Sequence, residues 1–185
     1  MSAQAFLDDS FALLERTPRV VRELVGGLPD SWLVARDTDA GWTARDVIGH
    51  LISAELDDWI PRAERILNDG ARIPFDPFDR FAHIERDRDA TLDELIDRFA
   101  GLRAQTIGRM RELVVNDDQL DKVGRHPELG AVTLRELIAT WTVHDLDHVA
   151  KIYAALAGAR DAEVGPWKAY LGILLRRDGA DSQGG

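Results

Sequence analysis

The chain has 185 residues and a formal net charge of −10, with 45% hydrophobic and 30% charged residues, the composition of an ordinary globular domain. Its acidity repels phosphate backbones, which argues against nucleic-acid binding. It contains no cysteine, which excludes disulfides, cysteine-ligated zinc and a cysteine nucleophile. The first residues lack the pattern of a signal peptide, and no apolar run approaches the ~20 residues that span a bilayer, so we expect a cytoplasmic protein.

The first predicted helix covers residues 2 to 25 or 26. Its apolar positions keep a spacing of four and then three: Leu7, Phe11, Leu14, Pro18, Val21, Val25 and Leu28. Pro18 should kink this helix, because it has no amide to bond the carbonyl of Leu14. Two glycines and a proline follow Val25 and end the helix.

The second predicted helix begins after Thr43, which with Asp46 resembles a capping box, and runs to about Asn68. It is apolar on two faces. One face carries Val47, His50, Leu51, Ala54 and Pro61, and the other carries Ile48, Ile52, Trp59, Ala63 and Ile66. A helix in a small bundle needs one apolar face, so the second face suggests burial against another copy or the C-terminal segment. We therefore expect a homodimer.

Residues 69–90 form a long connection with few helix signals. A connection of about 20 residues can return to the end where the second helix began, so the third helix should run parallel to the second. Thr91 and Glu94 form a capping box at its start, followed by apolar residues at helical spacing. Four arginines of this helix are interpreted as a solvated face: Arg98, Arg103, Arg109 and Arg111.

Residues 116–132 are predicted to form a structured loop. Thr133 and Glu136 form a further capping box, which opens a fourth helix that reaches about Leu156. A shorter fifth helix is expected at about residues 164–177, and the polar, glycine-rich tail at 178–185 is expected to be disordered. The sequence thus predicts an all-α fold: a single domain at residues 1–177, built as an up-down-down-up four-helix bundle with a short additional C-terminal helix.

Two histidines, His144 and His148, lie one turn apart on the fourth helix, roughly 6 Å between Cβ atoms, so both can reach one ion. The apolar periodicity of this helix turns both rings inward. An unpartnered buried polar group costs about 1–3 kcal/mol. Two interpretations stay open: a shared metal ion, or core histidines bonded to the backbone or to Asp145 and Asp147. The motif lacks the glutamate of H-E-x-x-H and does not predict a zinc protease.

A third histidine, His50, lies at a matching depth. It follows the cap of the second helix by about 10 Å along the axis, and His148 precedes the end of the fourth helix by about 12 Å. If these helices are antiparallel, His50, His144 and His148 converge near one end of the bundle. A three-histidine site with an open position suits Zn²⁺ or Ni²⁺.

Other polar residues are weaker candidates for this site. Asp57 lies seven residues after His50, and Asp147 lies three residues after His144, so both are candidate outer-shell groups. His83 and His126 fall in predicted loops, where a role in substrate binding is a hypothesis for each.

Three segments carry a family resemblance: G-W-T-A-R-D-V-I-G-H-L at residues 41–51, T-L-R-E-L at 133–137 and H-D-L-D-H at 144–148. Together they resemble the DinB-like family, also called the YfiT-like metalloenzymes, over about residues 6–156. The resemblance implies an up-down-down-up four-helix bundle, commonly dimeric, with a divalent metal on His50, His144 and His148. Lys151 replaces a glutamine of many relatives, a departure that concerns the substrate pocket rather than the metal site.

The resemblance implies a metal-dependent enzyme that acts on a small molecule. Family members with assigned chemistry include S-transferases that use bacillithiol or mycothiol and a mycothiol-dependent maleylpyruvate isomerase, so a thiol-dependent S-transferase is the leading hypothesis. In such enzymes the metal activates a cofactor thiol, which fits a chain without cysteine. Two alternatives stay open: a hydrolase that uses metal-bound hydroxide, and a stress-related binding protein without catalysis.

Overall fold

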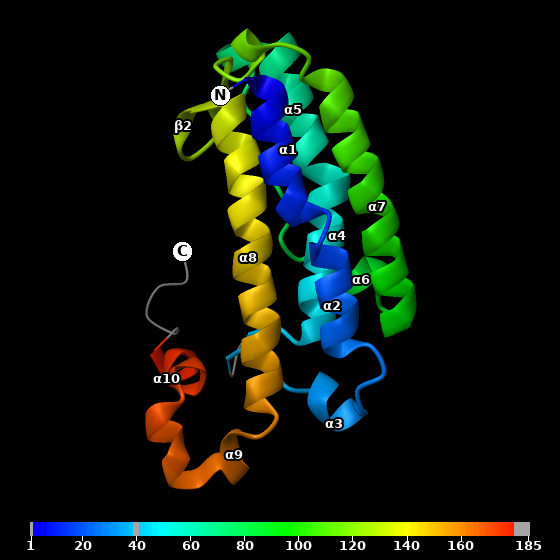
Figure 1. Ribbon diagram of the computed structural model, residues 1–185, viewed down its shortest axis with the longest axis vertical. Coiled ribbons are helices and arrows are strands. Elements are labelled where there is room, and N and C mark those ends of the chain that lie inside the picture. Colours follow the sequence, from blue (N-terminus) through cyan, green and yellow to red (C-terminus); the bar gives the residue numbers. More distant parts are fainter. Residues whose placement is uncertain (1, 39–40, 180–185) are drawn as a thin grey trace.

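The computed structural model describes residues 2–38 and 41–179 and is an all-α bundle (Figure 1). Four helical rods form it: α1 (Ala3–Leu14) with α2 (Thr17–Val25), α4 (Ala44–Asp57) with α5 (Trp59–Asn68), α7 (Leu92–Leu113), and α8 (Leu134–Gly158). The first and last rods run in one direction and the middle two run in the other (Figure 1). The predicted fold class and up-down-down-up topology are confirmed.

Short elements connect and extend the rods: α3 (Asp30–Leu33), the 3-10 turns η1 (Gly70–Arg72) and η2 (Asp117–Gln119), α6 (Ala82–Arg86), α9 (Asp161–Val164), η3 (Gly165–Tyr170) and α10 (Gly172–Gly179). The fifth predicted helix is therefore three short pieces, which turn back beside α8 (Figure 1). Of the tail predicted to be disordered, residues 178–179 belong to α10 and residues 180–185 lie outside the described residues.

The first rod is broken at the predicted kink. α1 ends at Leu14 and α2 begins at Thr17, so Pro18 occupies the first turn of α2, where its missing amide costs nothing. The free carbonyl of Leu14 instead accepts a hydrogen bond from Arg103 of α7 at 3.0 Å. A side chain from another rod thus satisfies the acceptor that the proline leaves open.

The second rod also breaks, at Asp58, because Pro61 has no amide to continue the hydrogen-bond ladder to Asp57. Apart from the exposed Pro61, both of its apolar faces are buried within one chain, since α6, α7 and α8 all pack against α4. Residues of the second face are at most 2% exposed: Ile48, Ile52, Trp59, Ala63 and Ile66. This face is therefore covered within one chain, and the homodimer stays a prediction.

The connections carry more structure than the sequence suggested. The long crossover contains α6, and the loop before α8 folds as an antiparallel hairpin of β1 (Val123–His126) and β2 (Gly130–Thr133). The amide of Phe75 in the crossover donates to the carbonyl of Arg125 at 2.9 Å, which ties the two connections together. A Cβ at Gly124 would lie 2.6 Å from Ile66, so only glycine lets the hairpin pack this closely on α5.

Arg103 corrects the interpretation of a solvated arginine face. Its side chain is 2% exposed, whereas those of Arg98 and Arg109 are 42% and 48% exposed. It forms ion pairs with Glu55 of α4 and Asp145 of α8 in the centre of the bundle. Arg103 lies four residues after Phe99 and three before Thr106, on the buried stripe of α7, so helical spacing contained the signal.

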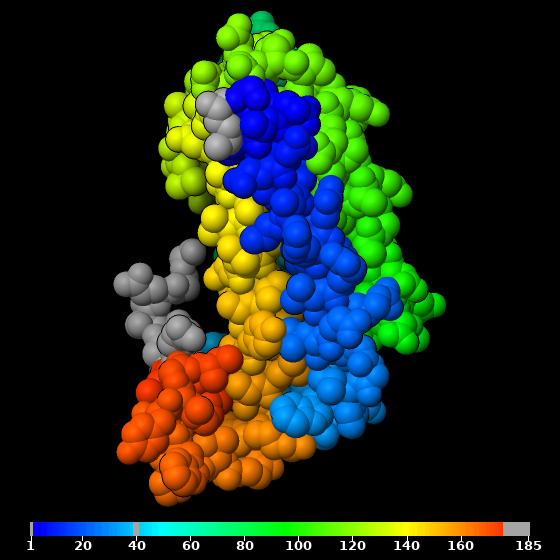
Figure 2. Space-filling view, viewed as in Figure 1, coloured from blue at the N-terminus to red at the C-terminus, as the bar shows by residue number. Residues whose placement is uncertain are grey.

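The remaining core is apolar and fills both halves of the bundle. Phe11, Trp59 and Trp141 lie in one cluster, and Val47, Ile48 and Phe99 lie in the other. The C-terminal segment, orange to red in Figure 2, projects beside the end of α8. Within the described ranges, no helix combines the length and apolarity that a membrane crossing requires.

Candidate metal centre

His50 is placed by the capped start of α4. The Thr43 hydroxyl accepts a hydrogen bond from the amide of Asp46 at 3.2 Å, and the Asp46 carboxylate accepts one from the amide of Thr43 at 2.9 Å. This reciprocal box fixes where the helix begins and therefore which side chains face inward. His50 is 4% exposed on that inward face.

His144 and His148 are placed by α8 in the same way. Thr133 and Glu136 form the capping box that begins this helix. His148 is 4% exposed, and His144 is half-buried. α8 runs antiparallel to α4 (Figure 1). Both residues therefore meet His50, as the matching depths of His50 and His148 predicted.

The three imidazoles converge closely enough to bind one ion. The Nε2 atoms of His50 and His144 are 3.3 Å apart, and one ring nitrogen from each of the three histidines lies within 4.8 Å of the others. Two nitrogens at 2.0–2.1 Å from a tetrahedral zinc ion would be about 3.3 Å apart, so this pair already has a ligand spacing. The Nδ1 atoms of all three lack a hydrogen bond of ordinary geometry to any described residue. The residues present therefore fit a divalent metal.

Burial keeps all three imidazoles neutral at ordinary pH. Burial, together with the nearby His144, lowers the pKa of His50 to about 3. It also lowers the pKa of His144 to about 4, with Lys151 as the next cause, and it lowers the pKa of His148 strongly. Neutral imidazole is the form that binds metal, so no proton has to be displaced near neutral pH.

Comparison with known proteins identifies the family. The family described as the DinB superfamily matches residues 13–152 of the chain. The chain belongs to the DinB superfamily. The match includes all three histidines of the cluster and ends before α9 and α10.

Named relatives of this family are similar over most of the chain. OB0782 of Oceanobacillus iheyensis, named as a candidate metal-dependent hydrolase, is 24% identical over 140 residues, which are 75% of this chain and 79% of that protein. YfiT of Bacillus subtilis, named in the same way, is 26% identical over 78% of this chain and 81% of its own. The solved structure of YfiT, described as an unusual four-helix bundle, matches with a TM-score of 0.69 and 25% identity over 80% of this chain and 83% of that one.

Aromatic rings enclose the DinB-type histidine cluster. The indole of Trp42 lies 4.8 Å from the ring of His50 and stacks at 17° over His148, at 6.2 Å between centroids. Trp59 meets His144 edge-on at 5.2 Å, and Phe78 meets His50 at 5.6 Å. These rings limit the space around the cluster and exclude water from most of it.

The remaining histidines have different surroundings. His83 was expected in a loop but lies on α6, is 2% exposed and has its ring 6.1 Å from that of His50. His126 lies on β1, where its Nδ1 accepts hydrogen bonds from the amides of Glu128 and Leu129 at 3.2 Å each. His126 therefore stabilises the hairpin turn and is not part of the cluster.

The candidate outer-shell carboxylates lie at the surface. Asp57 is exposed and borders a small depression with Arg62 and Asp76. Asp147 is exposed beside His144, where its charge opposes part of the lowering of the His144 pKa, and it forms an ion pair with Lys151 at 3.0 Å.

Asp145 was the other carboxylate considered as a partner for the histidines. It is buried and bound by Arg103 at 2.5 and 2.9 Å. Because Arg103 occupies Asp145, the interpretation of the histidines as core residues paired with Asp145 is disfavoured.

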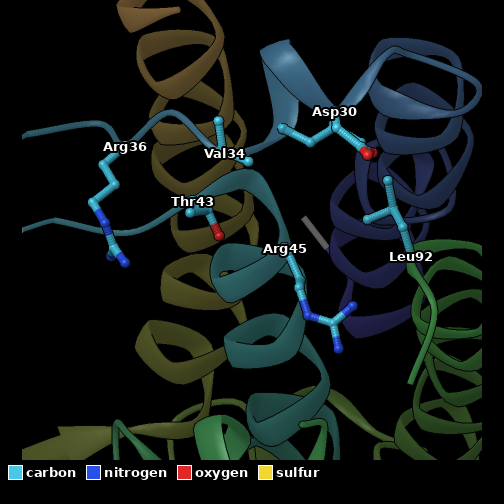
Figure 3. A pocket seen from close by; sticks show the side chains of 7 residues that line it. Asp30, Val34, Arg36, Thr43, Arg45 and Leu92 are labelled. Atoms are coloured by element: carbon cyan, nitrogen blue, oxygen red, sulfur yellow. The ribbon is translucent and has the colours of Figure 1, made fainter. Parts of the chain in front are cut away.

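Two of the hollows beside the helices that carry the cluster are large enough for a small molecule. A cavity of about 540 Å³ near the start of α4, shown in Figure 3, has no histidine in its lining: Asp30, Leu33, Val34, Arg36, Thr43, Arg45 and Leu92. A groove of about 520 Å³ follows one face of α8 and is lined by Glu136, Ala139, Thr140, Val143, His144 and Asp147. The half-buried His144 is the member of the cluster that lines this groove.

Proposed function

We propose that His50, His144 and His148 bind one divalent ion, Zn²⁺ or Ni²⁺, and that the protein is a metal-dependent hydrolase of a small molecule. The observation that carries the proposal is the convergence of three neutral imidazoles, two of them buried and one half-buried, with one ring nitrogen from each within 4.8 Å of the others and no further protein group in the described cluster. The names of the relatives OB0782 and YfiT support hydrolysis. When bound, such an ion supplies Lewis-acid activation of water or of a substrate carbonyl.

The residues of the chain prepare the site for this chemistry. The neutral imidazoles present lone pairs, and the rings of Trp42, Trp59 and Phe78 keep bulk water away from them. The groove along α8 is wide enough for a small molecule beside His144, and Ala139 and Val143 give its lining an apolar part. A low-dielectric surround strengthens the electrostatic interactions made inside it.

The test is elemental analysis of the purified protein together with hydrolysis of a panel of activated esters, amides and lactones. We expect about one divalent metal per chain, lost in His50→Ala and in His144→Ala, and hydrolysis that disappears with the metal. His126→Ala is the matched control, because this histidine lies outside the cluster. Absence of metal in the wild-type protein, before and after titration with Zn²⁺ and Ni²⁺, would refute the proposal.

A thiol-dependent S-transferase is the second candidate. It is favoured by the open position of the cluster together with the absence of cysteine from the chain, so that a thiol such as bacillithiol or mycothiol would have to come from outside. The same metal-loaded protein should then conjugate either thiol to electrophiles. Hydrolysis without conjugation rejects this candidate, and conjugation without hydrolysis rejects the first.

We also propose that the protein is a cytoplasmic homodimer. The apolar surface that supports an interface lies on α8, where Val143 is 63%, Leu146 is 52% and Tyr153 is 47% exposed. Light scattering coupled to gel filtration should give twice the mass of one chain, and Leu146→Glu should reduce it to one. A monomeric wild-type protein at micromolar concentration would exclude the dimer.

A further inference from the structure

A groove between α2 and α8 on the outside of the bundle has no part in the proposed function. Its volume is about 520 Å³, within the range of small-molecule sites, and it is lined by Arg16, Arg19, Val20, Glu23, Leu24 and Tyr153. α2 and α8 lie side by side on this face of the molecule (Figure 2). None of the three clustered histidines lines it, so the groove is separate from the metal centre.

Two positive charges in this groove have no protein partner. Within the described residues, the guanidinium groups of Arg16 and Arg19 form no ion pair, no side-chain hydrogen bond and no contact with an aromatic ring. Glu15, the acid nearest to Arg16 in sequence, lies 3.8 Å from Arg111 of α7 instead. Glu23 follows Arg19 by four residues, the order in which such a helical pair is weaker, and no ion pair joins the two.

The spacing of the two arginines suits one oxyanion. Arg16 and Arg19 are three residues apart, which makes them neighbours on one face of a helix, and both are exposed. Like charges at this distance repel each other, and an anion bound between them removes the repulsion. A guanidinium also binds carboxylate or phosphate through two parallel N–H···O hydrogen bonds. On a chain with a net charge of −10, the pair forms a local site for a negative group.

The remainder of the groove offers apolar surface to the same ligand. Val20 is 40% exposed and Tyr153 is 47% exposed, and Leu24 is half-buried. Leu24 follows Arg16 by about 12 Å along the helix axis, at 1.5 Å per residue. A ligand whose charged head lies at the arginines can therefore cover this surface with a tail of similar length. Glu23 lines the same stretch and repels a second negative charge there.

We propose that the groove between α2 and α8 binds a small amphiphilic anion, with one carboxylate or phosphate head at Arg16 and Arg19 and an apolar tail toward Leu24. Tyr153 of α8 forms the opposite wall of the tail site, and Glu23 selects a ligand with one charged end over a ligand with two. The inference does not rest on the metal centre, because the groove and the histidine cluster share no residue.

The test is isothermal titration calorimetry of the full chain with octanoate, octyl phosphate and octanedioate, each below the concentration at which it forms micelles. We expect the wild type to bind octanoate, octyl phosphate or both; the better of the two identifies the preferred head group. The double variant Arg16→Gln, Arg19→Gln should bind it at least about tenfold more weakly, because hydrogen bonds between charged groups are the strong ones. Both side chains are exposed and unpaired, so their loss leaves no buried group without a partner.

The matched control is the double variant Arg88→Gln, Arg109→Gln. It removes the same charge from side chains that are 65% and 48% exposed and lie outside the groove, and it should bind like the wild type. A second variant tests the other end of the site. Octanedioate should bind the wild type at least about threefold more weakly than octanoate, and Glu23→Gln should remove most of this difference. A gain of affinity in this variant cannot come from partial unfolding.

Four results would overturn the proposal. They are no binding of either octyl anion by the wild type, equal losses in the two arginine variants, loss of binding in His144→Ala, and a smaller molecular mass of the Arg16→Gln, Arg19→Gln variant in light scattering. The second result would reduce the effect to net charge, and the third would place the anion at the metal centre. The fourth would assign the groove to a second copy of the chain. Binding that persists in His144→Ala and weakens only in the groove variants supports the proposal, whether or not the protein binds Zn²⁺.

Discussion

Replacing Arg103 by methionine tests whether the buried ion cluster holds the bundle together. Every side of the guanidinium is occupied: it donates to Glu55 at 3.0 Å, to Asp145 at 2.5 and 2.9 Å, and to the carbonyl of Leu14 at 3.0 Å. Methionine keeps much of the volume but removes the positive charge that pairs with two buried carboxylates. The variant should therefore leave uncompensated charge in the core.

The expected loss is large. Removing one partner of a buried ion pair costs about 3–5 kcal/mol, and an unpaired buried carbonyl adds about 1 kcal/mol or more. The sum, roughly 4–6 kcal/mol, approaches the whole stability of many domains, which is about 5–15 kcal/mol. The cost should shrink as the pH falls, because burial already raises the pKa of Glu55 even with Arg103 present, and protonation removes the uncompensated charge.

The assay is urea unfolding of the metal-free protein, followed by tryptophan fluorescence at pH 7 and pH 5. Arg109→Met is the matched control on the same helix: it removes an exposed arginine that pairs with Glu64 and Glu112, and it should cost less than about 1 kcal/mol. Replacing Glu55, Arg103 and Asp145 together by Leu, Met and Leu should recover much of the loss. Equal stability of Arg103→Met and Arg109→Met would refute the reasoning.

Two further predictions concern the cluster and the helix beside it. The pKa values of His50 and His144 are about 3 and 4, below the ~6.5 of unfolded histidine, so the unfolded state binds more protons between these limits. The unfolding free energy of the metal-free protein should therefore fall below pH 6.5, by on the order of 1.4 kcal/mol per histidine per pH unit. In urea titrations, the double variant His50→Asn, His144→Asn should show a flatter dependence of this free energy on pH. An unchanged slope in that double variant would contradict this. Gly49→Ala should lower the stability by about 1–3 kcal/mol, because the added Cβ would lie 3.0 Å from His83. Gly101→Ala, on an open face of α7, should raise the stability by roughly 0.5–1 kcal/mol in the same thermal unfolding experiment. A change of the same sign in both variants would argue against the close packing of α6 on α4.

The features that the sequence predicted correctly depend on local signals. Thr91 and Thr133 mark two helix starts through side chains only three residues away, and the structure has both capping boxes. The depth of His50 and His148 follows from helix rise alone once the topology is known. Local sequence patterns were therefore enough to predict the helical rods and the meeting of the three histidines.

The features that the sequence did not reveal depend on distant partners. Arg103 is buried only because Glu55 and Asp145, 48 and 42 residues away, meet it in the core. The hairpin is fixed by the approach of Gly124 to Ile66 and Phe75, which no short-range pattern encodes. The sequence around His83 predicted a loop, whereas in the structure His83 lies on α6, which Arg86 bonds to α4.

The ion cluster also connects the break in the first rod to the candidate metal centre. One of its two carboxylates, Asp145, belongs to the residue next to His144. Three neutral imidazoles leave the charge of a bound divalent ion uncompensated, and a buried negative charge nearby offsets part of it. Arg103 therefore has two roles. It donates to the carbonyl that Pro18 leaves without an amide partner, and it pairs with two carboxylates that stay buried in the core. Replacing Glu55, Arg103 and Asp145 together by apolar residues should therefore give a protein that is more stable than Arg103→Met but binds Zn²⁺ more weakly than the wild type. This result would separate the electrostatic contribution of the ion cluster from its structural contribution.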